Sequence, residues 1–128
     1  MISLRRLLVI ALVILSAILI PGCAAPQKLE SVTVLPADTT LGATGLQVHY
    51  KAYGVFVHPP ATLDITNSVA WASSSPQIIS IDNTGVADYV MGCGTNILIT
   101  ATYTHNGSVM VGTATVNGQA LSCSTSGQ

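Results

Sequence analysis

Cysteine and histidine side chains offer the widest chemistry in this chain of 128 residues. They are Cys23, Cys93, Cys123, His49, His58 and His105. A structural zinc site is typically built from ligand pairs spaced two to five residues apart. None of these residues forms such a pair, so we predict no metal centre and no cofactor, and we expect the three histidines at the surface.

The carboxylates do not suggest acid–base catalysis. Asp82 and Asp88 flank a turn and, with Asn83, could hold a weak Ca²⁺, but a solvated turn explains them because the chain lacks an Asp-rich ligand string. Asp64 with Thr66 fits a turn in which the side chain bonds the backbone. No serine lies in a Gly-x-Ser-x-Gly nucleophile elbow. We therefore expect no enzyme activity.

Charge is scarce throughout the chain. Charged residues make up 7% of it, against about a quarter in an average soluble domain. Beyond Cys23 the chain carries two lysines and five acidic residues, and two minus five leaves a net charge of −3. They are Lys28, Lys51, Glu30, Asp38, Asp64, Asp82 and Asp88. This balance argues against a nucleic-acid partner, since such proteins neutralise phosphates with clustered basic residues.

The N-terminal segment has the parts of an export signal. Arg5 and Arg6 precede an apolar run over residues 7–20, which is shorter than the roughly 20 residues that span a bilayer. The sequence Leu-Ile-Pro-Gly-Cys over residues 19–23 resembles the lipobox of bacterial lipoproteins. This resemblance implies cleavage before Cys23, acylation of its sulfur and a stable membrane anchor.

We therefore predict a helical signal peptide over residues 1–22 and a lipidated tether over residues 23–28. The protein would be exported to the bacterial envelope, with its body in the periplasm or on the cell surface. In a cell with two membranes, Ala24 indicates the outer one, because an Asp retention signal is absent. An uncleaved anchor helix and an ordinary secretory signal with a chance cysteine are the alternatives.

The rest of the chain alternates apolar and polar residues with the period of two that is typical of β-strands. Such patterns cover 29–35, 46–53, 68–75, 78–81, 86–90, 97–103 and 109–116, with a short continuation at 39–41. Residues 54–67 look irregular, and His58-Pro59-Pro60 blocks a central strand there. Residues 92–94 look like a loop. Asn106-Gly107 predicts a hairpin turn.

About seven short strands with frequent turns indicate an all-β, antiparallel β-sandwich. Trp71 is the only tryptophan, and a lone Trp on a short strand typically fills the space between two sheets. The predicted core comprises Trp71, Val69, Val32, Val34, Leu46, Val48, Ile97 and Ile99.

Several blocks of sequence resemble the bacterial immunoglobulin-like domain, group 2, of invasin- and intimin-type surface proteins. They are Ser31–Ala37, Leu41–Ala52, Asp64–Ser74 with its V-x-W-x-S core, Asp82–Val86 and Gly94–Thr102. The departures are the insertion at 54–63 and the cysteines beyond Cys23. The resemblance implies an immunoglobulin-like domain over residues 29–117 with no active site of its own. A Ser-rich tail, 118–128, follows it.

With Cys23 lipidated, Cys93 and Cys123 form an even pair, which favours a disulfide in an exported domain. If Asn106-Gly107 is the turn, the numbers of two residues that face each other across the hairpin add up to about 213. Cys93 then lies opposite position 120, only about three residues from Cys123, and the flexible loop residues around it can span that distance. Two free thiols are the alternative.

Three functions fit these observations to different degrees. The first is a lipid-anchored, non-catalytic immunoglobulin-like module that acts in adhesion or structural presentation and binds a protein or a glycan. The second is a periplasmic accessory subunit that docks to an envelope complex through a sheet edge. A small hydrolase is the third, although no carboxylate pair or catalytic triad is apparent.

Overall fold

The structure of the protein is a computed structural model that describes residues 26–42, 44–120 and 123. The predicted signal peptide and Cys23 lie outside these residues. The described chain forms ten strands and one short 3-10 helix, η1. They are β1 (Lys28–Leu35), β2 (Asp38–Leu41), β3 (Gln47–His49), β4 (Lys51–Val57), β5 (Ala61–Asp64), η1 (Thr66–Ser68), β6 (Ala70–Ser73), β7 (Ile79–Ile81), β8 (Val86–Tyr89), β9 (Cys93–His105) and β10 (Ser108–Gln119).

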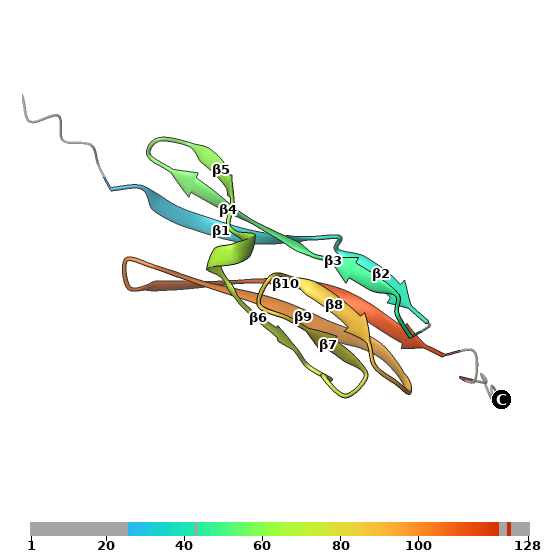
Figure 1. Cartoon of the computed structure of the whole chain (residues 1–128). Helices are drawn as coiled ribbons and strands as arrows, with labels where there is room; N and C mark the ends of the chain where they lie inside the picture. The colour runs from blue at the N-terminus through green and yellow to red at the C-terminus, as the bar shows by residue number, and fades with distance from the viewer. Residues whose placement is uncertain (1–25, 43, 121–122, 124–128) are drawn as a thin grey trace, which may run out of the picture.

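The strands form two layers that face each other (Figure 1). One layer is a four-stranded sheet in the order β2-β10-β9-β6. The other contains two ladders, β1-β4-β5 and β3-β8-β7, and β3 and β4 are consecutive parts of one chain segment. All pairs are antiparallel except β2 with β10. This is an all-β, immunoglobulin-like β-sandwich, as predicted, although with ten strands where the sequence patterns indicate about seven.

Apolar side chains from both layers fill the space between them. Ile79, Ile99 and Val116 are completely buried. The expected core residues Val34, Val69 and Ile97 are also buried, and Val32, Val48 and Trp71 are partly buried against the same cluster. Because these residues come from both sheets, their removal from water is the main force that holds the layers together.

Leu46 is not a core residue, and that prediction is wrong. Its side chain is 51% exposed. The alternation over residues 46–53 places Leu46 with Val48, but β3 begins only at Gln47, after a turn in which Gly45 has a φ of 86°. Leu46 therefore lies between the turn and the strand, and the strand's alternation of faces does not apply to it.

The predicted strand over residues 46–53 is divided between two ladders. β3 pairs with β8, whereas β4 pairs with β1 on one side and β5 on the other. Tyr50 lies between them, and its backbone N–H donates to the carbonyl of Gly85 at 2.7 Å. This segment therefore joins both ladders of its layer into one continuous wall of the sandwich.

Residues 54–67 are more regular than their sequence indicates. β4 continues through Val57, and β5 returns beside it with Phe56 opposite Ala61. The three residues His58, Pro59 and Pro60 form the turn of this hairpin, with His58 at a φ of 61°. The prolines exclude a strand only at the turn itself, so the region around them is free to form a ladder.

Trp71 is partly buried and packs against the core cluster between the layers. Its indole N–H donates to the carbonyl oxygen of Thr66 at 3.0 Å, and its ring centroid lies 6.4 Å from that of Tyr50. Gly85, with a φ of 86°, approaches both residues: an added Cβ would lie 2.6 Å from the Tyr50 carbonyl oxygen and 3.1 Å from the indole. Only glycine fits this contact.

Burial, and then the charge of Asp38, raises the pKa of Tyr50 to about 12.

Candidate functional site

The β9–β10 hairpin positions the cysteine pair. Asn106 and Gly107 both have positive φ, at 48° and 79°, which is the two-residue turn expected for Asn-Gly. Paired residue numbers sum to 213 from Ser108 opposite His105 to Val116 opposite Ile97. A bulge then shifts the sum to 212, so that Cys93 lies opposite Gln119. Residue 93 thus begins a strand where the sequence indicates a loop.

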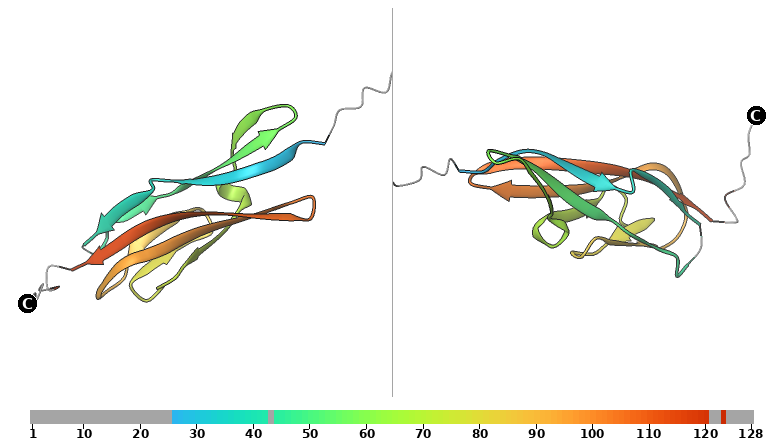
Figure 2. Two further views of the ribbon diagram at one scale, coloured as in Figure 1. Left: turned by 180° about the vertical axis from the view of Figure 1, so that it is seen from behind. Right: turned by 90° about the horizontal axis from the view of Figure 1, so that it is seen from above.

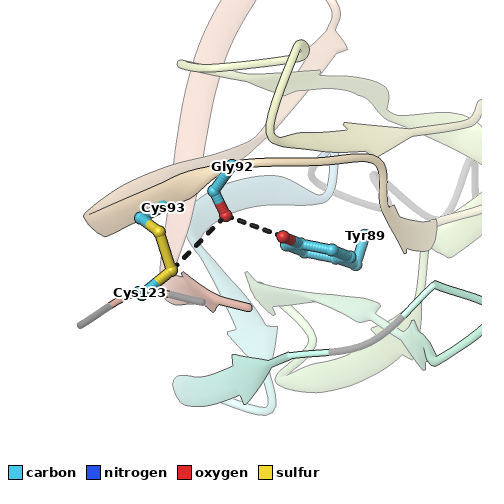
Figure 3. Close-up of a disulfide and its surroundings, with 4 residues drawn as sticks. All are labelled: Tyr89, Gly92, Cys93 and Cys123. Carbon is cyan, nitrogen blue, oxygen red and sulfur yellow. Dashed lines mark hydrogen bonds between the residues drawn. A yellow bond between two sulfur atoms is a disulfide. The ribbon is translucent and has the colours of Figure 1, made fainter. Parts of the chain in front are cut away.

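The structure brings Cys93 and Cys123 to disulfide distance, with their Cα atoms 5.9 Å apart (Figure 3). The loop before Cys93 is held by Tyr89, whose hydroxyl donates to the carbonyl oxygen of Gly92 at 2.7 Å. The Cys123 sulfur lies 3.8 Å from the same oxygen. β10 itself extends through Gln119, past the predicted domain boundary at residue 117. The cysteine pair therefore fixes the end of the last strand to the start of β9.

The histidines are not gathered into one site. His49 ends β3, and His58 lies in the β4–β5 turn. His105 stacks on Tyr103, with ring centroids 5.9 Å apart, and meets the edge of Phe56 at 5.8 Å. Across residues 26–42, 44–120 and 123, no three His, Cys, Asp or Glu residues lie close enough together to hold a metal ion.

Asp82 organises the β7–β8 turn. Its carboxylate accepts hydrogen bonds from the backbone N–H groups of Thr84 and Val86, at 2.8 and 2.9 Å, and from the Thr84 hydroxyl. These bonds, that of Val86 first, lower the pKa of Asp82. Asp88, the other residue considered for calcium, accepts a hydrogen bond from Gln47 at 2.7 Å. Asp82 thus bonds groups within its own turn, whereas Asp88 bonds a side chain across the β3–β8 ladder.

Asp64 has a similar structural role at the end of β5. It accepts hydrogen bonds from the hydroxyl and the backbone N–H of Thr66 and forms an ion pair with Lys51 at 3.4 Å. Hydrogen bonding to Thr66, more than to Lys51, lowers the pKa of Asp64. The Thr66 hydroxyl lies 3.1 Å from the backbone nitrogen of Ala52, which donates to it. This network fixes η1 and therefore also the carbonyl oxygen of Thr66, which accepts the hydrogen bond from the indole of Trp71.

The outer face of the β10-β9-β6 sheet is a surface of uniform chemical character. We call it the threonine face. Successive residues of a strand point to opposite sides, and directly paired residues share a side, as Val111, Thr102 and Ala70 do across the three strands. Its members are Ala70, Ala72, Leu98, Thr100, Thr102, Thr104, Val109, Val111, Thr113 and Thr115. Each of them is exposed or half-buried.

The threonine face has no charge. None of the residues of β6, β9 and β10 is Asp, Glu, Lys or Arg. Asp38, opposite Thr115 on the neighbouring β2, is the acidic residue at its border. Figure 2 shows β9 and β10 (orange and red) as the long paired strands of this sheet. The repeated Thr-x-Thr spacing over residues 100–104 and 113–115 is a signal for this face, but its width becomes visible only when the strands are paired.

The fold and its surfaces define the class of the protein: an immunoglobulin-like sandwich with an uncharged, hydroxyl-rich face and a cysteine pair at one end. No model of a known protein family matches the chain, and no curated protein matches its sequence. Within the described residues, no helix is long and apolar enough to cross a membrane.

Proposed function

We propose that the protein is a lipid-anchored, non-catalytic module of the bacterial envelope that binds a protein or a glycan through the threonine face. The observation that carries this proposal is the uncharged outer face of β6, β9 and β10. Its domain would be of the group 2 bacterial immunoglobulin-like type, on the sequence blocks that resemble that family. Adhesion or structural presentation at the envelope would be its role.

The chemistry of the threonine face suits an uncharged partner. Each threonine hydroxyl both donates and accepts hydrogen bonds, so five of them provide an array of contacts for sugar hydroxyls or peptide groups. Val109 and Val111 are 59% and 53% exposed, and exposed apolar side chains that cluster often mark interaction sites. Because no charge takes part, we expect binding to depend little on salt.

Anchoring follows from the N-terminal segment, which lies outside the described residues. The described chain begins at Pro26, three residues after Cys23, and β1 begins at Lys28. An acylated Cys23 would therefore hold the sandwich directly at the membrane surface.

A photo-crosslinking residue in place of Thr102 tests the proposed face in intact cells. We expect adducts with protein or glycan from position 102, and none from the same residue in place of Thr33, which is exposed on β1 in the opposite layer. Adding Thr113→Glu should reduce the adducts at least about tenfold, because a carboxylate without a partner is costly to bury. Equal adduct yields from positions 102 and 33 would contradict the proposal.

A second function, docking to an envelope complex through a sheet edge, is favoured by β6. This strand is an edge of its layer, and its four residues include neither a charge nor a proline. Charged residues and prolines commonly protect edge strands from the addition of a further strand, and β6 lacks both. Docking at β6 would survive Thr113→Glu, because Thr113 lies on β10, two strands away from β6. Adducts that persist in this variant would therefore favour the edge.

A further inference from the structure

A hollow of about 280 Å³ opens where the first strand begins, beside the turn of the β9–β10 hairpin. Residues from both segments line it. They include Pro26, Lys28, Leu29, His105, Asn106 and Ser108. In Figure 1 the start of β1 and this hairpin lie at the same end of the sandwich, while the end of β10 lies at the other.

The hollow combines an apolar wall with polar groups. Pro26 and the buried Leu29 supply apolar surface, and the methylene groups of Lys28 can add to it. Lys28, Asn106 and Ser108 bring an ammonium, an amide and a hydroxyl, all of which donate hydrogen bonds. An amphipathic molecule with an anionic head matches this arrangement.

Lys28 is available for such a ligand. Of the two lysines in the described chain, Lys51 forms an ion pair with Asp64, and no carboxylate of the described residues lies within 4.0 Å of the Lys28 ammonium. Glu30, two residues further along β1, is the acidic residue closest to it in sequence. None of the residues that line the hollow is acidic.

The length of the tether places the hollow near a membrane. An extended chain spans at most about 3.6 Å per residue, so Pro26 lies within about 11 Å of Cys23. The polar headgroup layer of a leaflet is itself about 5–7 Å thick. A lipid attached to Cys23 would therefore bring the hollow within reach of the headgroups.

We infer that this hollow binds the phosphate headgroup of an anionic phospholipid in the anchoring membrane. The inference rests on the proposed lipid anchor at Cys23. Lys28, Asn106 and Ser108 hold the phosphate, while Pro26 and Leu29 contact the glycerol region. The hairpin end of the sandwich then lies on the membrane, and the end with Cys93 and Cys123 points away from it.

The test uses the full chain purified from its membrane, with intact mass measured first to detect the lipid. The protein is reconstituted in phosphatidylcholine vesicles with or without phosphatidylglycerol, and acetylation of each lysine is followed by mass spectrometry. We expect phosphatidylglycerol to slow acetylation of Lys28 about fivefold. Lys51 is the internal control, and its rate should not change.

Asn106→Gly separates the hollow from the general field of an anionic surface. Glycine keeps the positive φ of this turn position but removes the amide. We expect the variant to lose most of the protection of Lys28. The inference would be overturned if Lys28 were protected as strongly in this variant as in the parent. It would also be overturned if phosphatidylglycerol changed the acetylation rate of neither Lys28 nor Lys51.

Two further results distinguish the anchor from the hollow. If inorganic phosphate protects Lys28 equally well in phosphatidylcholine vesicles, the site binds free phosphate and the lipid assignment is wrong. If the mature chain lacks the lipid mass, the proposed anchor is wrong. Phosphatidylglycerol vesicles added to that unlipidated chain then decide the inference by themselves: protection of Lys28 supports it, and no protection overturns it.

Discussion

Replacing Ile99 with alanine is expected to lower the free energy of unfolding by about 3 kcal/mol. Ile99 lies in the middle of β9, and its side chain has no exposed surface. Its neighbours across the ladder are Ala114 and Ser73, so small side chains flank it within its own sheet. The loss of its methyl and methylene groups would leave a cavity between the layers.

Leu98→Ala is the matched control for this change. Leu98 precedes Ile99 on the same strand, points to the threonine face and is 44% exposed. We expect its loss to cost less than about 1 kcal/mol, because much of the side chain is already in water. Urea unfolding of both variants measures the difference. If Leu98→Ala destabilises the protein as much as Ile99→Ala, the assignment of inner and outer faces is wrong.

Removal of the cysteine pair is expected to have an effect of similar size. Cys93 and Cys123 are 30 residues apart in the sequence, and closing a loop of this length in the unfolded chain stabilises a protein by about 3–4 kcal/mol on the chain-entropy estimate. The double variant Cys93→Ala, Cys123→Ala should therefore unfold at a lower urea concentration than the parent.

Chemical reduction and a third variant complete this experiment. A reducing agent should shift the unfolding midpoint of the parent protein and leave that of the double variant unchanged. Cys23→Ser should unfold like the parent, since that cysteine lies outside the pair. A parent midpoint that does not respond to reduction would contradict the disulfide.

Much of the fold could be predicted because β9 and β10 are specified locally. Their alternation assigns the buried faces, and Asn106-Gly107 fixes the turn and therefore the register. The register departs from the predicted sum only beyond Val116. There the Asn117 side chain accepts a hydrogen bond from the backbone N–H of Asn96 at 2.8 Å. A side chain that bonds the opposite strand leaves no periodic signal in the sequence.

Other elements depend on contacts that no local pattern contains. β2 pairs in parallel with the end of β10, 77 residues away in the sequence, as in the pair of Asp38 and Thr115. Leu46 fits the alternation of apolar and polar residues over 46–53, but β3 begins only at Gln47. β5 follows two prolines that are typical of loops. In each case the partner strand, rather than the segment itself, determines the outcome.

The candidate surfaces also depend partly on local sequence and partly on contacts between distant segments. Thr100 and Thr113 are 13 residues apart in sequence, yet they are directly paired on adjacent strands. The composition of the strands therefore indicates threonine-rich surface, whereas its gathering into one uncharged face depends on the register of three strands. The hollow beside Lys28 likewise needs residues from the start of β1 and from the β9–β10 turn. Pairing across long sequence separations created both features.

Metabolic labelling with palmitate tests the central claim of a lipid-anchored sandwich most directly. We expect the mature protein to carry the label and to remain in the membrane fraction, and the Cys23→Ser variant to lose both properties while unfolding like the parent. A parent protein without the label, or a Cys23→Ser variant that is still retained by the membrane, would contradict the lipid anchor.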